Sequence, residues 1–196
     1  MKYLLACMLA TFLPGMAQVG GPLNTHVNSR YSQAARFMSD ADKGDARARF
    51  DVGMLHEKGD VVPQNHKEAM KWFKMSAKDG YAPAQLFLGL LYMSGKSGEK
   101  DQIEAVKWIR LAADQGEINA QSLLGGLYFS DGIVTHNYVE AYKWLKLATP
   151  NSDANSAKTL ESVMQRMTPE QVAEAERLVS QWQANAHRKD SAGRVD

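Results

Sequence analysis

The chain has one cysteine, Cys7, among its 196 residues, and it carries no excess of either charge. Lysine and arginine number 23 against 22 acidic residues, which gives a net charge of +1. A chain so close to neutral has no overall field that would draw it to nucleic acid or to an anionic membrane surface. A single cysteine also excludes an internal disulfide and a cluster of thiolate metal ligands.

Signals for enzymatic chemistry are equally scarce. None of the five histidines has a second histidine three or four residues away, which is the spacing of a metal site on a helix. The G-x-S-x-G motif of serine hydrolases does not occur. We therefore expect no metal, no cofactor and no catalytic activity.

The first 17 residues have the pattern of a secretory signal peptide. Lys2 provides the positive charge, Leu4–Leu13 is an apolar run of ten residues, and small residues stand at Gly15 and Ala17. The run is too short to span a bilayer as a helix, so we expect no membrane insertion. A buried N-terminal helix and acylation of Cys7 are the alternatives. Cleavage after Ala17 would give a periplasmic or secreted protein.

The dominant pattern is a repeat of 36 residues. Trp72, Trp108 and Trp144 are spaced by this interval, and alanines, lysines and glycines keep the same register. Such a period indicates a stacked repeat array in which each unit is a pair of helices. The predicted organisation is a flexible lead-in at 18–28, a solenoid at 29–186 and a disordered tail at 187–196. Within the solenoid lie units 46–81, 82–117 and 118–153 and a C-terminal cap at 154–186.

The first helix of each predicted unit carries two apolar stripes. One repeats at i, i+4 and i+7 and is apolar at every position, so it must face the core. The other is offset by two residues, or about 200° around the helix, and has a mixed composition. Its large apolar members are Phe50, Met54, Leu86, Leu90, Met93 and Phe129.

Other repeated residues predict how the helices start and pack. Asn65, Asp101 and Asn137 each precede a glutamate by three residues, which is a variant of the capping box. A glycine inside the first helix recurs in all three units, although it costs about 1 kcal/mol relative to alanine. Close approach of two helices would offset that cost, and a flexible hinge is the alternative. We expect the three repeated tryptophans to be core residues.

These residues make the chain resemble the Sel-one-like repeat family, a relative of the tetratricopeptide repeats. The resemblance covers about residues 31–150. In the first unit His56 and Arg49 replace the tyrosine and glutamine of the family pattern. The second and third units match it at Ala82, Ala84, Gln85, Leu88, Gly89, Tyr92, Gly95, Ala105, Trp108, Ala112, Ala113, Gly116, Ala120, Gln121, Leu124, Gly125, Tyr128, Ala141, Trp144 and Ala148.

The resemblance implies an all-α fold, a right-handed αα-hairpin solenoid of about four repeats with helical caps and with first helices lining the concave face. It also implies a non-catalytic scaffold that binds a protein or peptide in the bacterial envelope or secreted space. Some cysteine-rich members of the family are linked to penicillin binding or hydrolysis. This chain lacks their paired cysteines, so binding or hydrolysis of β-lactams is a remote alternative.

Two surfaces are candidates for the partner. The second stripe would form an apolar groove on the concave face, where exposed apolar side chains usually mark an interaction site. Neighbouring helices or the segment 18–28 covering this stripe is the alternative. The second candidate is a ladder of cations on the second helices, which would bind an envelope glycan: Lys71, Lys74, Lys107, Arg110, Lys143 and Lys146. A solvated face balanced by the capping glutamates and the helix C-terminal dipoles is the favoured explanation of the ladder. We expect a monomer.

We predict that the exported protein begins at Gln18. The small residues at Gly15 and Ala17, placed directly after the apolar run, define the cleavage site. Intact mass spectrometry of the protein recovered from the culture or periplasm measures this terminus. An intact Met1 or an acylated Cys7 would contradict the prediction.

Overall fold

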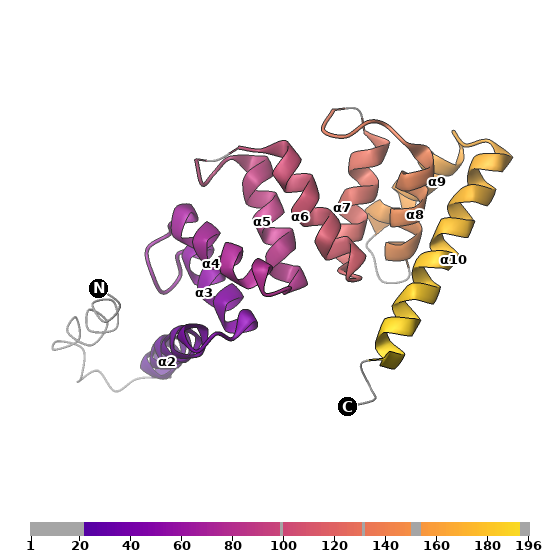
Figure 1. Cartoon of the computed structure of the whole chain (residues 1–196). Coiled ribbons are helices and arrows are strands. Elements are labelled where there is room, and N and C mark those ends of the chain that lie inside the picture. Colours follow the sequence, from indigo (N-terminus) through magenta and orange to yellow (C-terminus); the bar gives the residue numbers. More distant parts are fainter. Residues whose placement is uncertain (1–21, 99, 131, 150–153, 193–196) are drawn as a thin grey trace. The chain divides into compact units, whose positions relative to one another are not determined.

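The computed structural model describes residues 22–98, 100–130, 132–149 and 154–192. Throughout these ranges the regular structure is α-helical (Figure 1). The chain divides into two units, residues 1–79 and 80–196. The first contains α2 (Pro22–Asp42), α3 (Ala46–Lys58) and α4 (His66–Lys78). The second contains α5 (Ala82–Ser94), α6 (Gln102–Asp114), α7 (Ile118–Phe129), α8 (Tyr138–Ala148), α9 (Ala154–Met164) and α10 (Pro169–Ala192). The predicted fold class, all-α with paired helices of the tetratricopeptide type, is confirmed.

The second helix of each repeat begins at the predicted cap. The side-chain oxygens of Asn65, Asp101 and Asn137 accept hydrogen bonds from the amides of the first turn. In a complete capping box the glutamate three residues later accepts a hydrogen bond from the cap amide. Here the glutamate instead binds the lysine one turn on, with Lys71–Glu68 at 2.5 Å and Lys107–Glu104 at 2.6 Å. The reason is that the cap amide already has another acceptor.

That acceptor is a backbone carbonyl at the end of the preceding helix. The amide of Asn65 donates to the carbonyl of His56 at 2.8 Å. Asp101 donates in the same way to Tyr92 at 3.1 Å, and Asn137 to Tyr128 at 3.0 Å. The three bonds keep the 36-residue register and span nine residues each. They close the loop between the two helices of every repeat.

The recurring glycines lie where paired helices meet. A Cβ built on Gly53 would stand 2.5 Å from the ring of Phe73. On Gly89 it would stand 2.6 Å from Ile109 Cγ1, and on Gly125 2.6 Å from Leu145 Cγ. Real Cβ atoms do not approach other atoms so closely, so these positions require glycine. The predicted close approach of the helices is confirmed.

The substitution of glutamine by Arg49 in the first repeat preserves a structural bond. Gln121 Nε2 in the third repeat donates to the carbonyl of Ala113 at 3.1 Å. Arg49 Nε donates to the carbonyl of Ala41 at 3.3 Å, and its guanidinium also binds Asp79. Residues 41 and 113 are separated by two repeat periods. The arginine therefore satisfies the same backbone oxygen as the family glutamine.

The prediction that all three tryptophans are core residues is correct only for Trp144. Its side chain is fully buried, its indole Nε1 donates to Glu140 at 2.9 Å, and the Lys143 ammonium lies 4.1 Å from the ring centre. Trp72 and Trp108 are only half-buried. Glu68 and Glu104 stand four residues before Trp72 and Trp108, just as Glu140 stands before Trp144, so the acceptor is not the difference. The difference is that α8 also packs against α9 and α10, and that Trp182 of α10 packs against the cluster containing Trp144.

Helical structure extends beyond both predicted ends of the solenoid. The lead-in at 18–28 was predicted to be flexible, yet α2 begins at Pro22. Proline is well suited to the first position of a helix, which outweighs the weak helix formers that follow. The tail at 187–196 was predicted to be disordered, but α10 continues to Ala192. Arg188 binds Asn185 and the carbonyl of Ala184 there. The predicted signal peptide lies outside the described residues.

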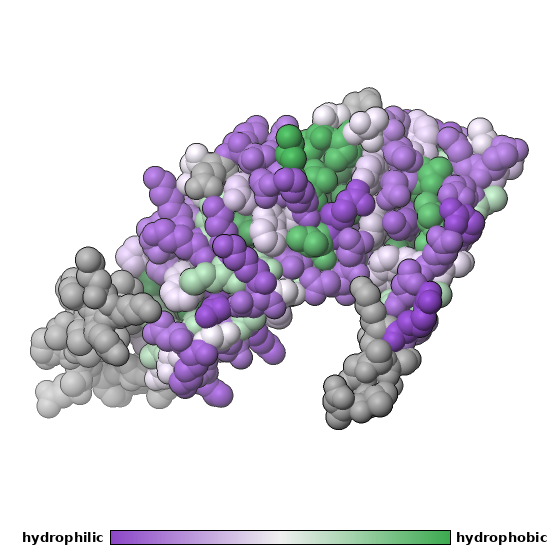
Figure 2. Space-filling model, viewed as in Figure 1, coloured by the Kyte–Doolittle hydropathy of each residue, from purple (hydrophilic) through white to green (hydrophobic). Residues whose placement is uncertain are grey.

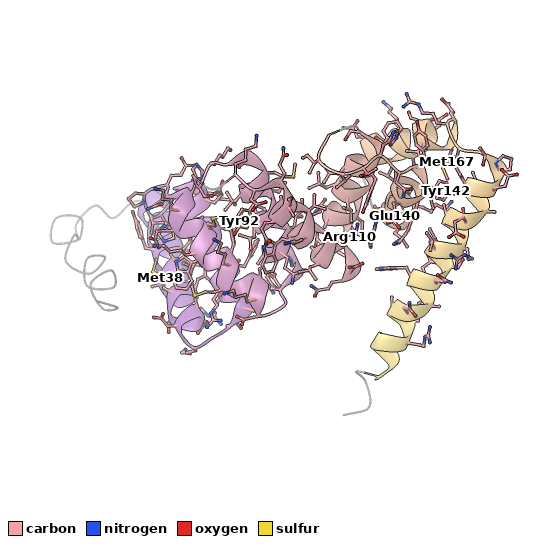
Figure 3. The ribbon with its side chains drawn as sticks, turned by 45° about the horizontal axis from the view of Figure 1, so that its top comes forward. Met38, Tyr92, Arg110, Glu140, Tyr142 and Met167 are labelled. Atoms are coloured by element: carbon pink, nitrogen blue, oxygen red, sulfur yellow. The ribbon has the colours of Figure 1, made fainter. Side chains whose placement is uncertain are left out.

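The C-terminal cap packs against the last repeat. Thr168 and Gln171 form a reciprocal capping box, with each amide donating to the side chain of the other. The Tyr142 hydroxyl on α8 donates to Glu176 on α10, and Figure 3 shows Tyr142 beside that helix. Burial and the neighbouring Glu176 carboxylate raise the pKa of Tyr142 to about 12. Trp182 packs against the core cluster that contains Trp144.

Two adjacent glycines of α7 allow a matched test of this packing. Gly125→Ala should destabilise the protein by about 1–3 kcal/mol, because its Cβ would meet Leu145 and the backbone of α8. Gly126→Ala should stabilise it by up to about 1 kcal/mol, because its Cβ meets nothing within 4 Å and alanine favours helix. Urea unfolding measures both. Effects of the same sign would contradict the assignment of Gly125 as a contact point.

His56 occupies the tyrosine position of the first repeat and makes an incomplete set of contacts. Its Nδ1 atom is buried without a hydrogen-bond partner, while the ring bonds the backbone of Pro63. Burial lowers the pKa of His56 below its ordinary value of 6.5, and the Glu68 carboxylate opposes this shift. The folded protein therefore favours the neutral ring.

This predicts a loss of stability in mild acid. Unfolded His56 takes up a proton near pH 6.5, whereas folded His56 does so only at lower pH. The neutral ring of His56 therefore contributes its full stabilisation above about pH 6.5. This contribution is lost as the pH falls through the pKa of His56 in the folded protein. Urea unfolding at about pH 7.5 and about pH 5 should show a smaller loss for His56→Tyr than for the wild type. Equal losses would show that other groups cause the acid sensitivity.

Candidate functional site

A hollow of about 410 Å³ lies in the first unit and contains two of the six predicted groove residues. Phe50 and Met54 of α3 line it, together with Phe37 of α2, a helix that packs directly against α3. Phe50 also contacts the ring of Phe73, with centroids 5.5 Å apart. Neighbouring helices leave both side chains only half-buried, so part of their surface faces the hollow.

Charged groups surround the apolar part of this hollow. Arg30, Lys58 and Asp60 are exposed, whereas Asp51 is half-buried. Burial raises the pKa of Asp51, and so does the neighbouring Asp45 carboxylate, while Arg47 lowers it. Asp51 also lines a second, adjoining hollow between α2 and the start of α3. A ligand here would meet an apolar wall with one partly desolvated carboxylate.

The predicted groove residues of α5 do not share one environment. Leu86 is 6 % exposed and belongs to a core cluster with Ile109 and Trp144. Met93 is half-buried and packs against that cluster, whereas Leu90 is 37 % exposed. Leu90 is therefore the member of this group with the most surface available to a partner. Leu86 contributes mainly to folding.

Phe129 of α7 packs into a different cluster. Its ring lies 6.3 Å from Tyr138 and 6.4 Å from His136, and the Arg166 guanidinium lies 4.9 Å above it. The same ring packs beside the core of α8, α9 and α10. Residues of its own unit thus cover much of Phe129. The structure brings together Phe50 and Met54, and it also brings together Leu86 and Met93.

The cation ladder is largely neutralised within each unit. Lys71, Lys107 and Lys143 pair with the capping glutamates of their own helices. Lys146 lies 3.7 Å from Glu176, and Arg110 donates to the Tyr128 hydroxyl. Figure 3 shows Arg110 and Glu140 among these side chains. All six cations therefore have partners inside the protein.

Figure 2 shows that most of the visible face is hydrophilic, with apolar patches over α6–α7 and over the α8–α10 region of the second unit. Ile103, in the first turn of α6, is 72 % exposed. A single exposed side chain of this kind is common on protein surfaces.

No helix of the described residues is long and apolar enough to cross a membrane. Those residues also contain no group of three or more histidine, cysteine or acidic side chains arranged to hold a metal ion.

The sequence also contains one S-x-x-K spacing, Ser97–Lys100. In serine–lysine enzymes this spacing places both side chains on one face of a helix. Ser97 instead lies in the turn after α5, where its hydroxyl is buried without a hydrogen-bond partner, and Lys100 is exposed. The geometry does not form an activated nucleophile.

Sequence reasoning missed Phe37 and Asp51 as lining residues. Phe37 lies on a terminal helix whose role as a wall depends on tertiary packing. Asp51 lies beside the apolar stripe rather than on it, so a search for apolar side chains passes over it. The 36-residue register contained a usable signal for Asp51, because the equivalent positions of the next two repeats are apolar.

Comparison with known proteins places these features in a family. The Sel1 repeat model matches residues 46–81, 82–117 and 118–149, which is more than half of the chain. Among solved structures, a protective antigen of uropathogenic Escherichia coli strains with an SLR fold is 30 % identical, with a TM-score of 0.70. The match covers 78 % of this chain and 33 % of the antigen, so the chain spans about a third of that protein.

A Sel1 repeat protein from Oxalobacter formigenes is 32 % identical, with a TM-score of 0.60, over 66 % of this chain and 98 % of that protein. No curated protein matches the sequence. The three matched segments coincide with the helix pairs α3–α4, α5–α6 and α7–α8. The chain belongs to the Sel1 repeat family, whose members generally act as protein-interaction scaffolds.

Proposed function

We propose that the protein is a non-catalytic scaffold that binds a protein or peptide on the face formed by the first helices of its repeats. The observation that carries the proposal is the hollow of about 410 Å³ beside Phe50 and Met54. Ligand sites in proteins commonly have a volume of about 300–1,000 Å³ with an apolar lining and a few polar groups. Large apolar anchors in such a site supply most of the affinity of a bound peptide.

Leu90 provides a second contact point on an equivalent surface of the next repeat. It occupies the position of Met54 one period later and is 37 % exposed. The first helices of these two repeats thus each offer an apolar side chain to a partner.

Binding of an envelope glycan through the cation ladder is the less favoured function. A surface that recognises an anionic polymer needs cations that are free to pair with it. Here Lys71, Lys107 and Lys143 already pair with glutamates one turn away. An ion pair on the surface is worth little, about 0–1 kcal/mol, so a polymer would have to compete with several of them at once.

The absence of catalysis is also part of the proposal. Sel1 repeat proteins are typically non-catalytic scaffolds. The buried hydroxyl of Ser97 and the exposed Lys100 do not contact each other, which argues against acyl-transfer chemistry such as β-lactam hydrolysis. Cleavage after Ala17 would place a monomeric protein in the periplasm or the medium, where a scaffold without disulfides is unaffected by the redox environment.

Substitution in the hollow should remove the partner without unfolding the protein. We expect Phe50→Ser combined with Met54→Ser to lose a partner captured from envelope extract by the wild type, because both anchors become small and polar. The melting temperature should fall modestly, through the lost contact of Phe50 with Phe73. Circular dichroism and quantitative pull-down measure the two effects.

Leu111→Ser is the matched control. Leu111 is 47 % exposed on α6 and does not line the hollow, so the variant should keep the partner. Sedimentation of the wild type with purified cell wall tests the glycan alternative in parallel. Retention of the partner by the double variant, or cosedimentation that depends on Lys74 and Lys107, would contradict the proposal. A double variant that fails to fold would show that both residues serve the core.

A further inference from the structure

Asp51 breaks the pattern of the repeats. One period later its position is held by Phe87, and two periods later by Leu123. Both of these are half-buried, and Leu123 packs against the core cluster of its unit. Asp51 is half-buried as well. The first repeat thus has a carboxylate at a position where the other two have a large apolar side chain.

The surroundings of Asp51 compensate for this burial only in part, through the charge of Arg47. No hydrogen bond or ion pair connects its carboxylate to any other residue that the structure describes. The nearby acids are occupied, since Asp40 pairs with Lys43 at 3.0 Å and Arg36 at 3.7 Å, and Asp45 caps α3 through the Ala48 amide at 2.6 Å. Arg47 is the cation whose charge lowers the pKa of Asp51, and its side chain is exposed.

The remaining charges around the hollow differ from Asp51 in one respect. Arg30, Lys58 and Asp60 are exposed and keep their hydration. A hydrated surface charge gains little from a new partner, whereas a partly desolvated charge gains more. Asp51 is therefore the group whose interactions improve most when a ligand supplies a cation. The apolar wall beside it is made of Phe37, Phe50 and Met54.

We propose that this hollow recognises a peptide in which an arginine or lysine stands next to a large apolar residue. The cation pairs with Asp51, and the apolar side chain packs between Phe37, Phe50 and Met54. Arginine suits the site best, because its planar guanidinium forms two parallel hydrogen bonds to a carboxylate and its weak hydration makes entry less costly. This inference rests on the proposed peptide-binding function and specifies the chemistry of the ligand.

Three facts support basic over acidic ligands. Asp51 lines both the hollow and its neighbour, so it lies where the two openings meet. Burial raises the pKa of Asp51 and the Arg47 charge offsets this only in part, so a further cation would favour the ionised form. An acidic peptide would have only exposed cations to bind and would place like charges beside Asp51. A cationic side chain relieves the desolvation instead.

The test uses capped synthetic peptides of defined composition. Each contains one large apolar residue next to arginine, with glycine and serine elsewhere. Two matched sets replace the arginine by citrulline, its neutral isostere, or by glutamate. Fluorescence anisotropy measures their affinity for the full-length protein and for Asp51→Asn. Asp42→Asn is the control variant, because Asp42 is an exposed acid of α2 outside both hollows.

We expect wild-type protein to bind the arginine set about tenfold more tightly than the citrulline set, as a charge-assisted hydrogen-bonded pair provides. The ratio should fall to about one in Asp51→Asn and stay unchanged in Asp42→Asn. A ratio that survives in Asp51→Asn, or a preference for the glutamate set, would overturn the inference. Equal binding of all three sets would leave peptide binding intact but would also overturn it. Failure of every set to bind would count against the proposed function itself.

A second variant separates recognition from folding. Asp51→Leu installs the residue found at position 123 and should raise the melting temperature, because it replaces a desolvated carboxylate by an apolar contact. The same variant should lose the arginine preference completely. A fall in melting temperature would mean that the carboxylate stabilises the fold, and the inference would then be wrong.

Discussion

The fold depends on the distance at which the two helices of each repeat approach each other. Gly53, Gly89 and Gly125 allow the first helix to lie directly against a large side chain or the backbone of the second. Each glycine weakens its own helix by about 1 kcal/mol, so the helix packing that it permits must stabilise the fold by more than this amount. The apolar stripe, the capped loop and the small alanines all serve this same contact.

Once the core contact is set, the opposite side of each first helix is free to vary. The three repeats use that freedom differently: α3 borders a hollow with Asp51, α5 exposes Leu90, and α7 covers Phe129 with residues of its own unit. Function in such an architecture resides in the positions that are not repeated. The departures from the 36-residue pattern are therefore more informative about the ligand than the pattern itself.

The sequence predicted the features that depend on local spacing. The helix pairs, the caps at Asn65, Asp101 and Asn137, and the role of the glycines follow from periodicity and short-range chemistry. Features that depend on neighbouring elements were missed. The half-burial of Trp72 and Trp108, the buried state of Leu86, and the wall formed by Phe37 arise from side chains that meet only after the helices pack. Periodicity alone carries no information on those contacts.

The carbonyl-to-cap hydrogen bonds of His56, Tyr92 and Tyr128 have a kinetic consequence. Each joins residues only nine positions apart and fixes the turn between two helices that pack together. Chain segments of about ten residues close within about 10–100 ns, and topologies dominated by such short-range contacts fold in microseconds to milliseconds. Every hairpin can thus form before its neighbours are available. Folding of this chain should therefore begin in one helical hairpin and extend to the neighbouring repeats.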